Sequence, residues 1–81
     1  MAAIRIRLFG VYRELSGESE ASAELPPGST AEDLMTHLRS QPCFRMLPTR
    51  PLVAVNLRYV ELDHPLQEGD EVAIIPPVAG G

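Results

Sequence analysis

The chain has 81 residues, which is enough for one domain with a small core and too short for two. Apolar residues make up 44% and charged residues 22%, proportions typical of a folded globular protein rather than a disordered one. Seven basic and eleven acidic residues give a net charge of −4, which argues against a protein that binds nucleic acid through an excess of cations.

In residues 4–9, Ile4, Ile6 and Leu8 alternate with two arginines and Phe9, which is the period-two pattern of a strand with one buried face. Phe9 falls on the same face as the arginines of this strand. Residues 11–15 form a short helix or turn that ends at a Ser-Gly pair. A second, shorter strand follows at residues 21–25.

A helix is predicted to begin at Ser29 or Thr30. Ser29 with Glu32 and Thr30 with Asp33 both have the spacing of a capping box, and either cap gives the same helix. Apolar residues then recur at helical spacing and predict a stripe that packs against a sheet. The stripe consists of Ala31, Leu34, Met35 and Leu38.

Three prolines interrupt residues 40–51, so we expect an irregular connection there. Phe44, Met46 and Leu47 are predicted to fix it against the core. Cys43 is the only cysteine, which excludes an intramolecular disulfide and a cysteine cage for zinc or iron. Its neighbours suggest a small apolar filler rather than a reactive thiol.

The last part of the chain predicts three more strands. Residues 52–55 are a continuous apolar run of the kind found in interior strands, and Asn56 then tolerates a turn with positive φ. Residues 57–62 form a short strand. The final strand, residues 71–75, is stopped by a pair of prolines.

The predicted element order is therefore β-β-α-β-β-β. A strand pair, a crossing helix and further strands give a mixed sheet with the helix packed on one face. We predict an α+β fold of the β-grasp (ubiquitin-like) type over residues 1–75, followed by an extended diglycine tail over residues 76–81.

The tail is a candidate for chemistry. Two prolines favour a stiff, extended segment, and terminal glycines let the walls of a narrow site approach the backbone closely. The reactive group would be the α-carboxylate of Gly81. The alternative is an unused chain end, which terminal residues commonly are. The tail consists of Pro76, Pro77, Val78, Ala79, Gly80 and Gly81.

A carboxylate is a poor electrophile, so acyl transfer from Gly81 first requires activation, most simply as an acyl-adenylate made from ATP. The six glycines of the chain form neither a Walker pattern nor a Gly-x-Gly-x-x-Gly loop. The activating enzyme must therefore be another protein. All seven basic residues are arginine, so the chain also has no lysine for Schiff-base chemistry or for lysine-linked polymers of itself.

Other polar residues give weaker signals. His37 and His64 lie far apart with no metal-binding spacing, so we predict no metal site. Glu68, Asp70 and Glu71 flank a turn glycine and are expected to be solvated, although they could meet a basic partner. The N-terminus lacks a secretory signal and the apolar runs are too short to span a bilayer. We expect a cytoplasmic protein that binds neither membrane nor nucleic acid.

Two apolar residues are out of phase with the buried set on their strands. With Leu8 inward, Phe9 points outward, and with Ile74 inward, Ile75 points outward. The first and last strands of a β-grasp fold are neighbours, so Phe9 and Ile75 could share a patch that Tyr59 joins. The alternative is ordinary exposed apolar residues, which need no explanation when they occur singly.

Several stretches together resemble the family of small, ubiquitin-like sulfur-carrier subunits of molybdopterin synthase over nearly the whole chain. They are VAVN at 53–56, DHPL at 63–66, EGDEVA at 68–73 and PPVAGG at 76–81. The resemblance implies that Gly81 is adenylated by a ubiquitin-activating-like adenylyltransferase and converted to a thiocarboxylate. It also implies that the tail enters a large catalytic subunit, where the sulfur builds the dithiolene of molybdopterin.

The resemblance further implies partner contacts at Phe9, Tyr59 and Ile75. On this interpretation the chain is not an enzyme by itself and binds no cofactor, while ATP is used by the activating partner. Three alternatives stay open: a thiamine-pathway sulfur carrier, a ubiquitin-like modifier joined to lysines of other proteins, and an interaction domain with an inert tail.

Overall fold

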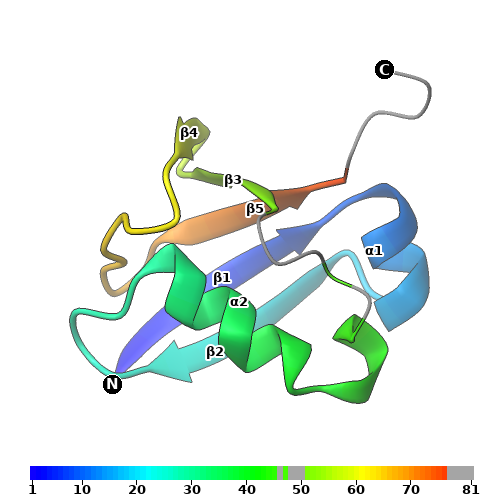
Figure 1. Ribbon diagram of the computed structural model, residues 1–81, viewed down its shortest axis with the longest axis horizontal. Helices are drawn as coiled ribbons and strands as arrows, with labels where there is room; N and C mark the ends of the chain where they lie inside the picture. Colours follow the sequence, from blue (N-terminus) through cyan, green and yellow to red (C-terminus); the bar gives the residue numbers. More distant parts are fainter. Residues whose placement is uncertain (46, 48–50, 77–81) are drawn as a thin grey trace.

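The computed structural model describes residues 1–45, 47 and 51–76, apart from the side chain of Cys43. Within them the chain forms five strands, two α-helices and one short 3-10 helix (Figure 1). In chain order these are β1 (Ala2–Leu8), α1 (Gly10–Ser16), β2 (Glu20–Leu25), α2 (Ala31–Arg39), η1 (Pro42–Phe44), β3 (Leu52–Val55), β4 (Arg58–Val60) and β5 (Glu71–Ile75).

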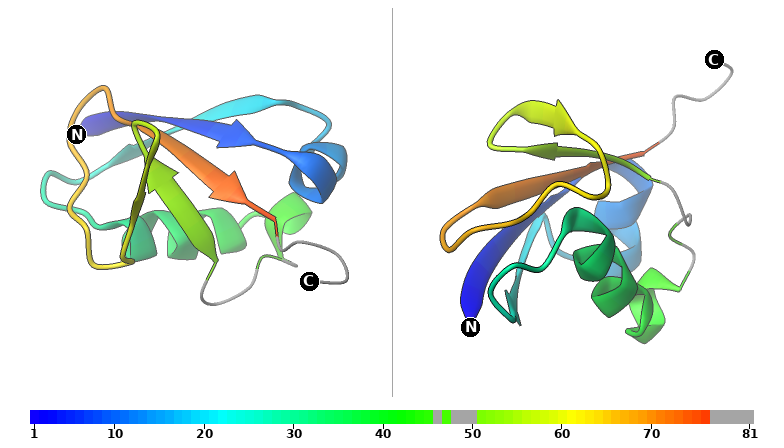
Figure 2. Two further views of the ribbon diagram at one scale, coloured as in Figure 1. Left: turned by 90° about the horizontal axis from the view of Figure 1, so that it is seen from above. Right: turned by 60° about the vertical axis from the view of Figure 1, so that its left-hand side comes forward.

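The strands form one mixed sheet in the order β2-β1-β5-β3-β4. β1 and β5 pair in parallel at its centre, and the other neighbours pair antiparallel. α2 lies across one face of this sheet, as the views in Figure 2 show. The predicted β-grasp fold is thereby confirmed, including the adjacency of the first and last strands.

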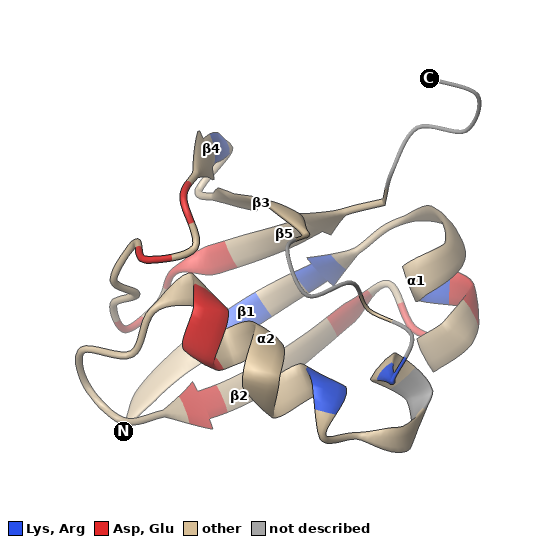
Figure 3. Cartoon of the chain, viewed as in Figure 1, with Lys and Arg blue, Asp and Glu red and all other residues tan. Residues whose placement is uncertain are grey.

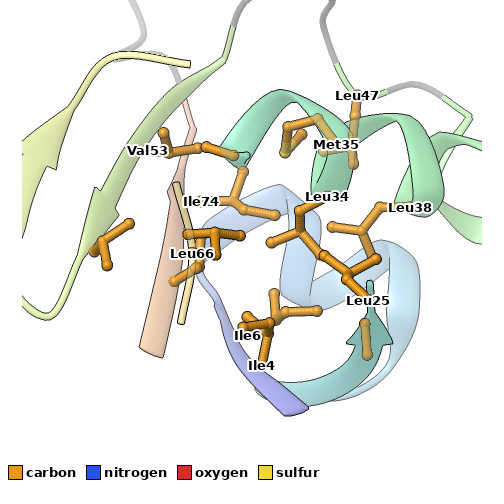
Figure 4. Packing of buried hydrophobic residues seen from close by; sticks show 14 of the residues in the cluster. Ile4, Ile6, Leu25, Leu34, Met35, Leu38, Leu47, Val53, Leu66 and Ile74 are labelled. Carbon is orange, nitrogen blue, oxygen red and sulfur yellow. The ribbon is translucent and has the colours of Figure 1, made fainter. Parts of the chain in front are cut away.

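The core lies between the sheet and α2. Period-two alternation in β1 and β5 directs every second side chain into it, and the stripe of α2 covers them from the other side. Figure 4 shows these side chains packed together, with Leu66 from the loop before β5 among them. The largest completely buried residues are Ile4, Ile6, Leu8, Leu34, Met35, Leu38, Val53, Val72 and Ile74.

The start of α2 is fixed by one of the two predicted caps. The Asp33 N–H donates to Thr30 Oγ1 at 3.2 Å, and the Thr30 N–H donates to Asp33 Oδ2 at 2.9 Å. This reciprocal capping box satisfies two backbone donors that a helix start otherwise leaves free. Ser29 instead donates its hydroxyl to the Pro26 carbonyl at 2.7 Å.

Two segments differ from the prediction. The short helix α1 begins at Gly10, one residue earlier than expected, and buries Tyr12. β4 has only three residues. At its start, Leu57 (φ 72°) belongs with Asn56 (φ 51°) to the turn after β3. Beyond its end, the Leu62 carbonyl accepts a hydrogen bond from the Glu32 N–H of α2 at 2.9 Å. The positive φ predicted for Asn56 is confirmed.

The connection between α2 and β3 contains η1, and Phe44 and Leu47 from this region are buried in the core. The prediction for Met46 and that for the side chain of Cys43 lie outside the described residues. No helix in the described part of the chain is long and apolar enough to cross a membrane.

Candidate functional site

The face of the sheet opposite α2 carries a group of exposed apolar side chains. Phe9 is 40% exposed, Leu52 is 52% exposed and Tyr59 is 71% exposed, while Ile75 is half-buried. Alternate side chains of β1 and β5 point into the core, and the strand pairings place Leu52, Tyr59 and Ile75 on the opposite face of the sheet. We call Phe9, Leu52, Tyr59 and Ile75 the outer patch.

The strand register brings three of these residues into one row. Ile75 pairs with Leu52 on β3. The pairing of β1 with β5 ends at Leu8 and Ile74, and continuing this register by one residue sets Phe9 beside Ile75. The structure thus places Phe9 and Ile75 together on the outer face. Leu52 was missed in the sequence analysis, because it belongs to an apolar run that predicts burial on both faces.

Tyr59 lies in the adjacent row. It pairs with Ala54 of β3, which pairs with Ala73 of β5, which pairs with Arg7 of β1. Two alanines therefore separate Tyr59 from Arg7, and Ala54 is only 8% exposed although it lies on the outer face.

Arg7 is a cation at the border of the outer patch. Its guanidinium carbon lies 5.8 Å from the centre of the Phe9 ring, a cation–π distance. Its Nη1 lies 3.8 Å from Glu71 Oε2 in an ion pair. Its Nε is buried and has no hydrogen-bond partner among the described residues. Figure 3 shows arginine positions of β1 next to an acidic position at the start of β5.

The tail leaves the fold beside the outer patch. Pro76 follows Ile75 directly, and a Cβ built on Gly10 would lie 3.2 Å from Pro76 Cγ. Gly10 also has φ +53°, a backbone angle that residues with a side chain rarely adopt. The first residue of α1 thus lets Pro76 pack close to it. The rest of the predicted tail, including Gly80 and Gly81, lies outside the described residues.

The acidic turn before β5 is structural, in contrast to the expectation that its carboxylates are only solvated. Glu68 Oε1 accepts a hydrogen bond from the Ala3 N–H at 2.8 Å. Asp70 accepts from Asn56 Nδ2 at 3.0 Å and from the Gln67 N–H at 2.8 Å. Asn56 Oδ1 in turn accepts from the Glu71 N–H at 3.1 Å. These bonds tie the β3–β4 turn to the start of β5.

The histidines form no metal site with their neighbours. His37 is exposed on α2, and His64 is half-buried in the loop between β4 and β5. Among the described residues, no group of three or more His, Cys, Asp or Glu side chains is arranged to hold a metal ion. The outer patch and the adjoining tail are therefore the strongest candidate site.

Comparison with known proteins gives three findings of use. The ThiS family profile matches residues 6–81. A protein from Escherichia coli (strain K12) named molybdopterin synthase sulfur carrier subunit is 40% identical over 83 residues, which cover 96% of this chain and 99% of that protein. The third finding is that solved structures share the fold.

Small archaeal modifier protein 1 from Haloferax volcanii has a TM-score of 0.85 at 23% identity, covering 96% of this chain and all of that one. A complex of subunits 1 and 2 of molybdopterin-converting factor from Helicobacter pylori contains a chain with a TM-score of 0.72 at 22% identity. That match covers 98% of this chain and 99% of the other. Both likenesses establish the ubiquitin-like fold.

Proposed function

This chain belongs to the ThiS family, and we propose that it is the sulfur-carrier small subunit of a molybdopterin synthase. The observation that carries the proposal is the near-full-length match to a relative of that name. The structure adds a supporting arrangement: an exposed apolar surface lies directly beside the strand end from which the tail continues. A partner that covers the outer patch is thus well placed to receive the tail.

The proposed chemistry takes place at the carboxylate of Gly81. A carboxylate oxygen attacks the α-phosphorus of ATP and pyrophosphate leaves, which gives an acyl-adenylate with a good leaving group. Hydrosulfide, the simplest sulfur nucleophile, then attacks the acyl carbon and displaces AMP, and loss of the S–H proton leaves a thiocarboxylate. The lack of a nucleotide-binding motif in the sequence supports an activating partner of the adenylyltransferase type. ATP belongs to that partner, and this chain binds no cofactor of its own.

The second half of the cycle uses the large catalytic subunit. The thiocarboxylate enters its active site, where its sulfur bonds to a carbon of the pterin precursor. Water then cleaves the bond between that sulfur and the acyl carbon of Gly81 and restores the carboxylate. The phosphate of the precursor needs a cationic pocket. A chain of net charge −4 without lysine is a poor site for phosphate, so the large subunit selects the acceptor. We propose that this chain delivers the sulfur and catalyses no step alone, and that Phe9, Tyr59 and Ile75 contact both partners in turn.

The test supplies the thiocarboxylated protein with pterin precursor, with and without a molybdopterin synthase large subunit. We expect dithiolene formation only when both proteins are present, and none from a variant that lacks Gly80 and Gly81. Efficient formation without the large subunit would overturn the division of labour. No transfer with a cognate large subunit would favour the thiamine-pathway carrier or the protein modifier.

The state of the chain end in the cell is an independent check. Intact-mass analysis of the protein isolated from its native cells should find a fraction heavier by the difference between sulfur and oxygen. A chain end found joined to lysines of other proteins, with no thiocarboxylate fraction, would contradict the proposal.

A further inference from the structure

Arg7 is in an unusual position for a cation. It borders the outer patch, with its guanidinium near the face of the Phe9 ring and its Nη1 3.8 Å from Glu71. At this distance the ion pair is too long to be a hydrogen bond, and the buried Nε has no partner among the described residues. The guanidinium therefore has unused donor capacity.

Docking of a partner on the outer patch would leave more of the Arg7 N–H donors without a hydrogen-bond partner. The Arg7 side chain is 42% exposed, so water satisfies part of the guanidinium in the free protein. A purely apolar partner surface laid over Phe9 would remove that water and give no acceptor in exchange. Burying a guanidinium whose N–H donors lack hydrogen-bond partners is strongly unfavourable, so such a complex would be destabilised at Arg7.

We propose that Arg7 is a specificity-determining contact, and that the large catalytic subunit, when it docks on the outer patch, presents an aspartate or glutamate carboxylate to it. This inference rests on the proposed function, because it concerns the surface by which the carrier meets its partner. A guanidinium donates two parallel hydrogen bonds to the two oxygens of a carboxylate. A carboxylate is therefore a better partner for Arg7 than a carbonyl group, which has one oxygen and no charge.

Charge and preorganisation both support a carboxylate. The chain as a whole is acidic, so a carboxylate of the partner is repelled by most of the surface and attracted at Arg7. The Phe9 ring and Glu71 already restrict the guanidinium, which lowers the entropy lost on binding. The patch thus combines apolar contact area with one cation that sets the position of the partner.

Arg5 offers a matched control. It lies two residues before Arg7 on the same strand and the same face, is exposed, and pairs in register with Glu71 rather than with Ala73. It is thus one outward-facing position further along β1 from the outer patch. Replacing either arginine by methionine removes the same charge and keeps a similar aliphatic stem. A difference in binding affinity between the two variants is therefore due to the position of the arginine.

The experiment measures the affinity of wild type, Arg7→Met and Arg5→Met for a purified molybdopterin synthase large subunit by calorimetry at low and high salt. We expect Arg7→Met to weaken binding about 30-fold or more, and Arg5→Met to change it by less than about 3-fold. Salt should weaken the binding of wild type more than that of Arg7→Met. The melting temperature of Arg7→Met alone should change little, because the substitution removes one long, partly exposed ion pair together with a buried donor that has no partner.

Each remaining outcome contradicts a stated claim. Unchanged or tighter binding by Arg7→Met, with wild type binding normally, would overturn the role of Arg7 and leave the proposed function intact. Weaker binding accompanied by a clear loss of melting temperature would assign Arg7 a structural role and also overturn the inference. Failure of the wild type to bind any large subunit would instead overturn the proposed function, and the inference with it.

Discussion

Leu52 and Ile75 lie directly opposite each other in the antiparallel pairing of β3 with β5, on the face of the sheet away from α2. Leu52 is half-exposed although it begins an uninterrupted apolar run, and its neighbour Val53 is 1% exposed in the core. Two consecutive residues of similar chemistry therefore have different roles. Val53 stabilises the fold, and Leu52 extends the outer patch beyond Phe9 and Ile75.

Replacing Leu52 by alanine should weaken binding to the large subunit by about 1 to 2 kcal/mol and leave the free energy of unfolding nearly unchanged. Phe9→Ala should act in the same direction. The matched control is Val53→Ala, which should lower the free energy of unfolding by about 1 to 3 kcal/mol through loss of core packing. Calorimetric titration and chemical denaturation measure the two quantities. A large loss of stability in Leu52→Ala would show that it belongs to the core.

Asp70 should contribute more to stability than an ordinary surface carboxylate. Its two oxygens accept hydrogen bonds from Asn56 Nδ2 and the Gln67 N–H, so Asp70→Ala should lower the free energy of unfolding by about 1 to 2 kcal/mol. Asp63→Ala removes the same charge from an exposed position and should cost less than about 0.5 kcal/mol. Denaturation with urea distinguishes them. Equal losses of stability in the two variants would show that the hydrogen bonds of Asp70 do not stabilise the fold.

The turn after β3 contains local strain that one substitution should relieve. Leu57 has φ 72°, which is unfavourable for a residue with a Cβ, and its side chain is 92% exposed, so packing gives little in return. Leu57→Gly should raise the free energy of unfolding by about 0.5 to 1 kcal/mol, since Asn-Gly suits a turn with two positive φ values.

The control for this prediction is Leu57→Ala, which removes most of the side chain and keeps the Cβ. It should leave the stability close to that of the wild type. If alanine stabilised the protein as much as glycine does, the exposed leucine side chain rather than the backbone angle would be responsible.

Local patterns in the sequence predicted the strands, the two helical segments and the capping box. They also predicted the turn at Asn56, and the outward directions of Phe9 and Ile75 follow from alternation along single strands. These features depend on residues within a few positions of each other. The sequence alone carries the necessary information because each depends on backbone geometry rather than on distant contacts.

The features that were missed all depend on pairing between distant segments. The exposure of Leu52, the bond from the Ala3 N–H to Glu68 and the position of Arg7 against Glu71 each require the sheet order and its register. Alternation along one strand does not say which strand lies beside it. For this reason the carboxylates near the last turn were expected to be solvated, and Arg7 was not identified as part of the site.

Burial raises the pKa of the Tyr12 phenol above its usual value of 10.0. A raised pKa in the folded state means that the folded protein holds this proton more tightly than the unfolded chain. The stability that this proton contributes is fully present below the pKa of Tyr12 in the unfolded chain. It is lost as the pH rises through the pKa of Tyr12 in the folded protein. The free energy of unfolding should therefore fall above about pH 10.

The pKa of Tyr12 can be measured directly, because the chain has only two tyrosines. In Tyr59→Phe the tyrosinate absorbance comes from Tyr12 alone and should appear above its usual pKa. Tyr12→Phe should show a smaller loss of stability at high pH. A Tyr12 phenol that ionises at its ordinary pKa in the folded protein would contradict this.

The length of the tail should matter for activation and not for folding. One residue added after Gly81 moves the carboxylate away from the nucleotide of the activating enzyme, and a misplacement of about 1 Å can cost on the order of 100-fold in rate. One residue added before Met1, which is exposed, changes the chain length at the other end and serves as the control. ATP–pyrophosphate exchange should fall sharply only in the C-terminal extension, while both variants melt like the wild type. Equal exchange by the extended and native chain ends would show that the carboxylate of Gly81 is not the group that the activating enzyme positions.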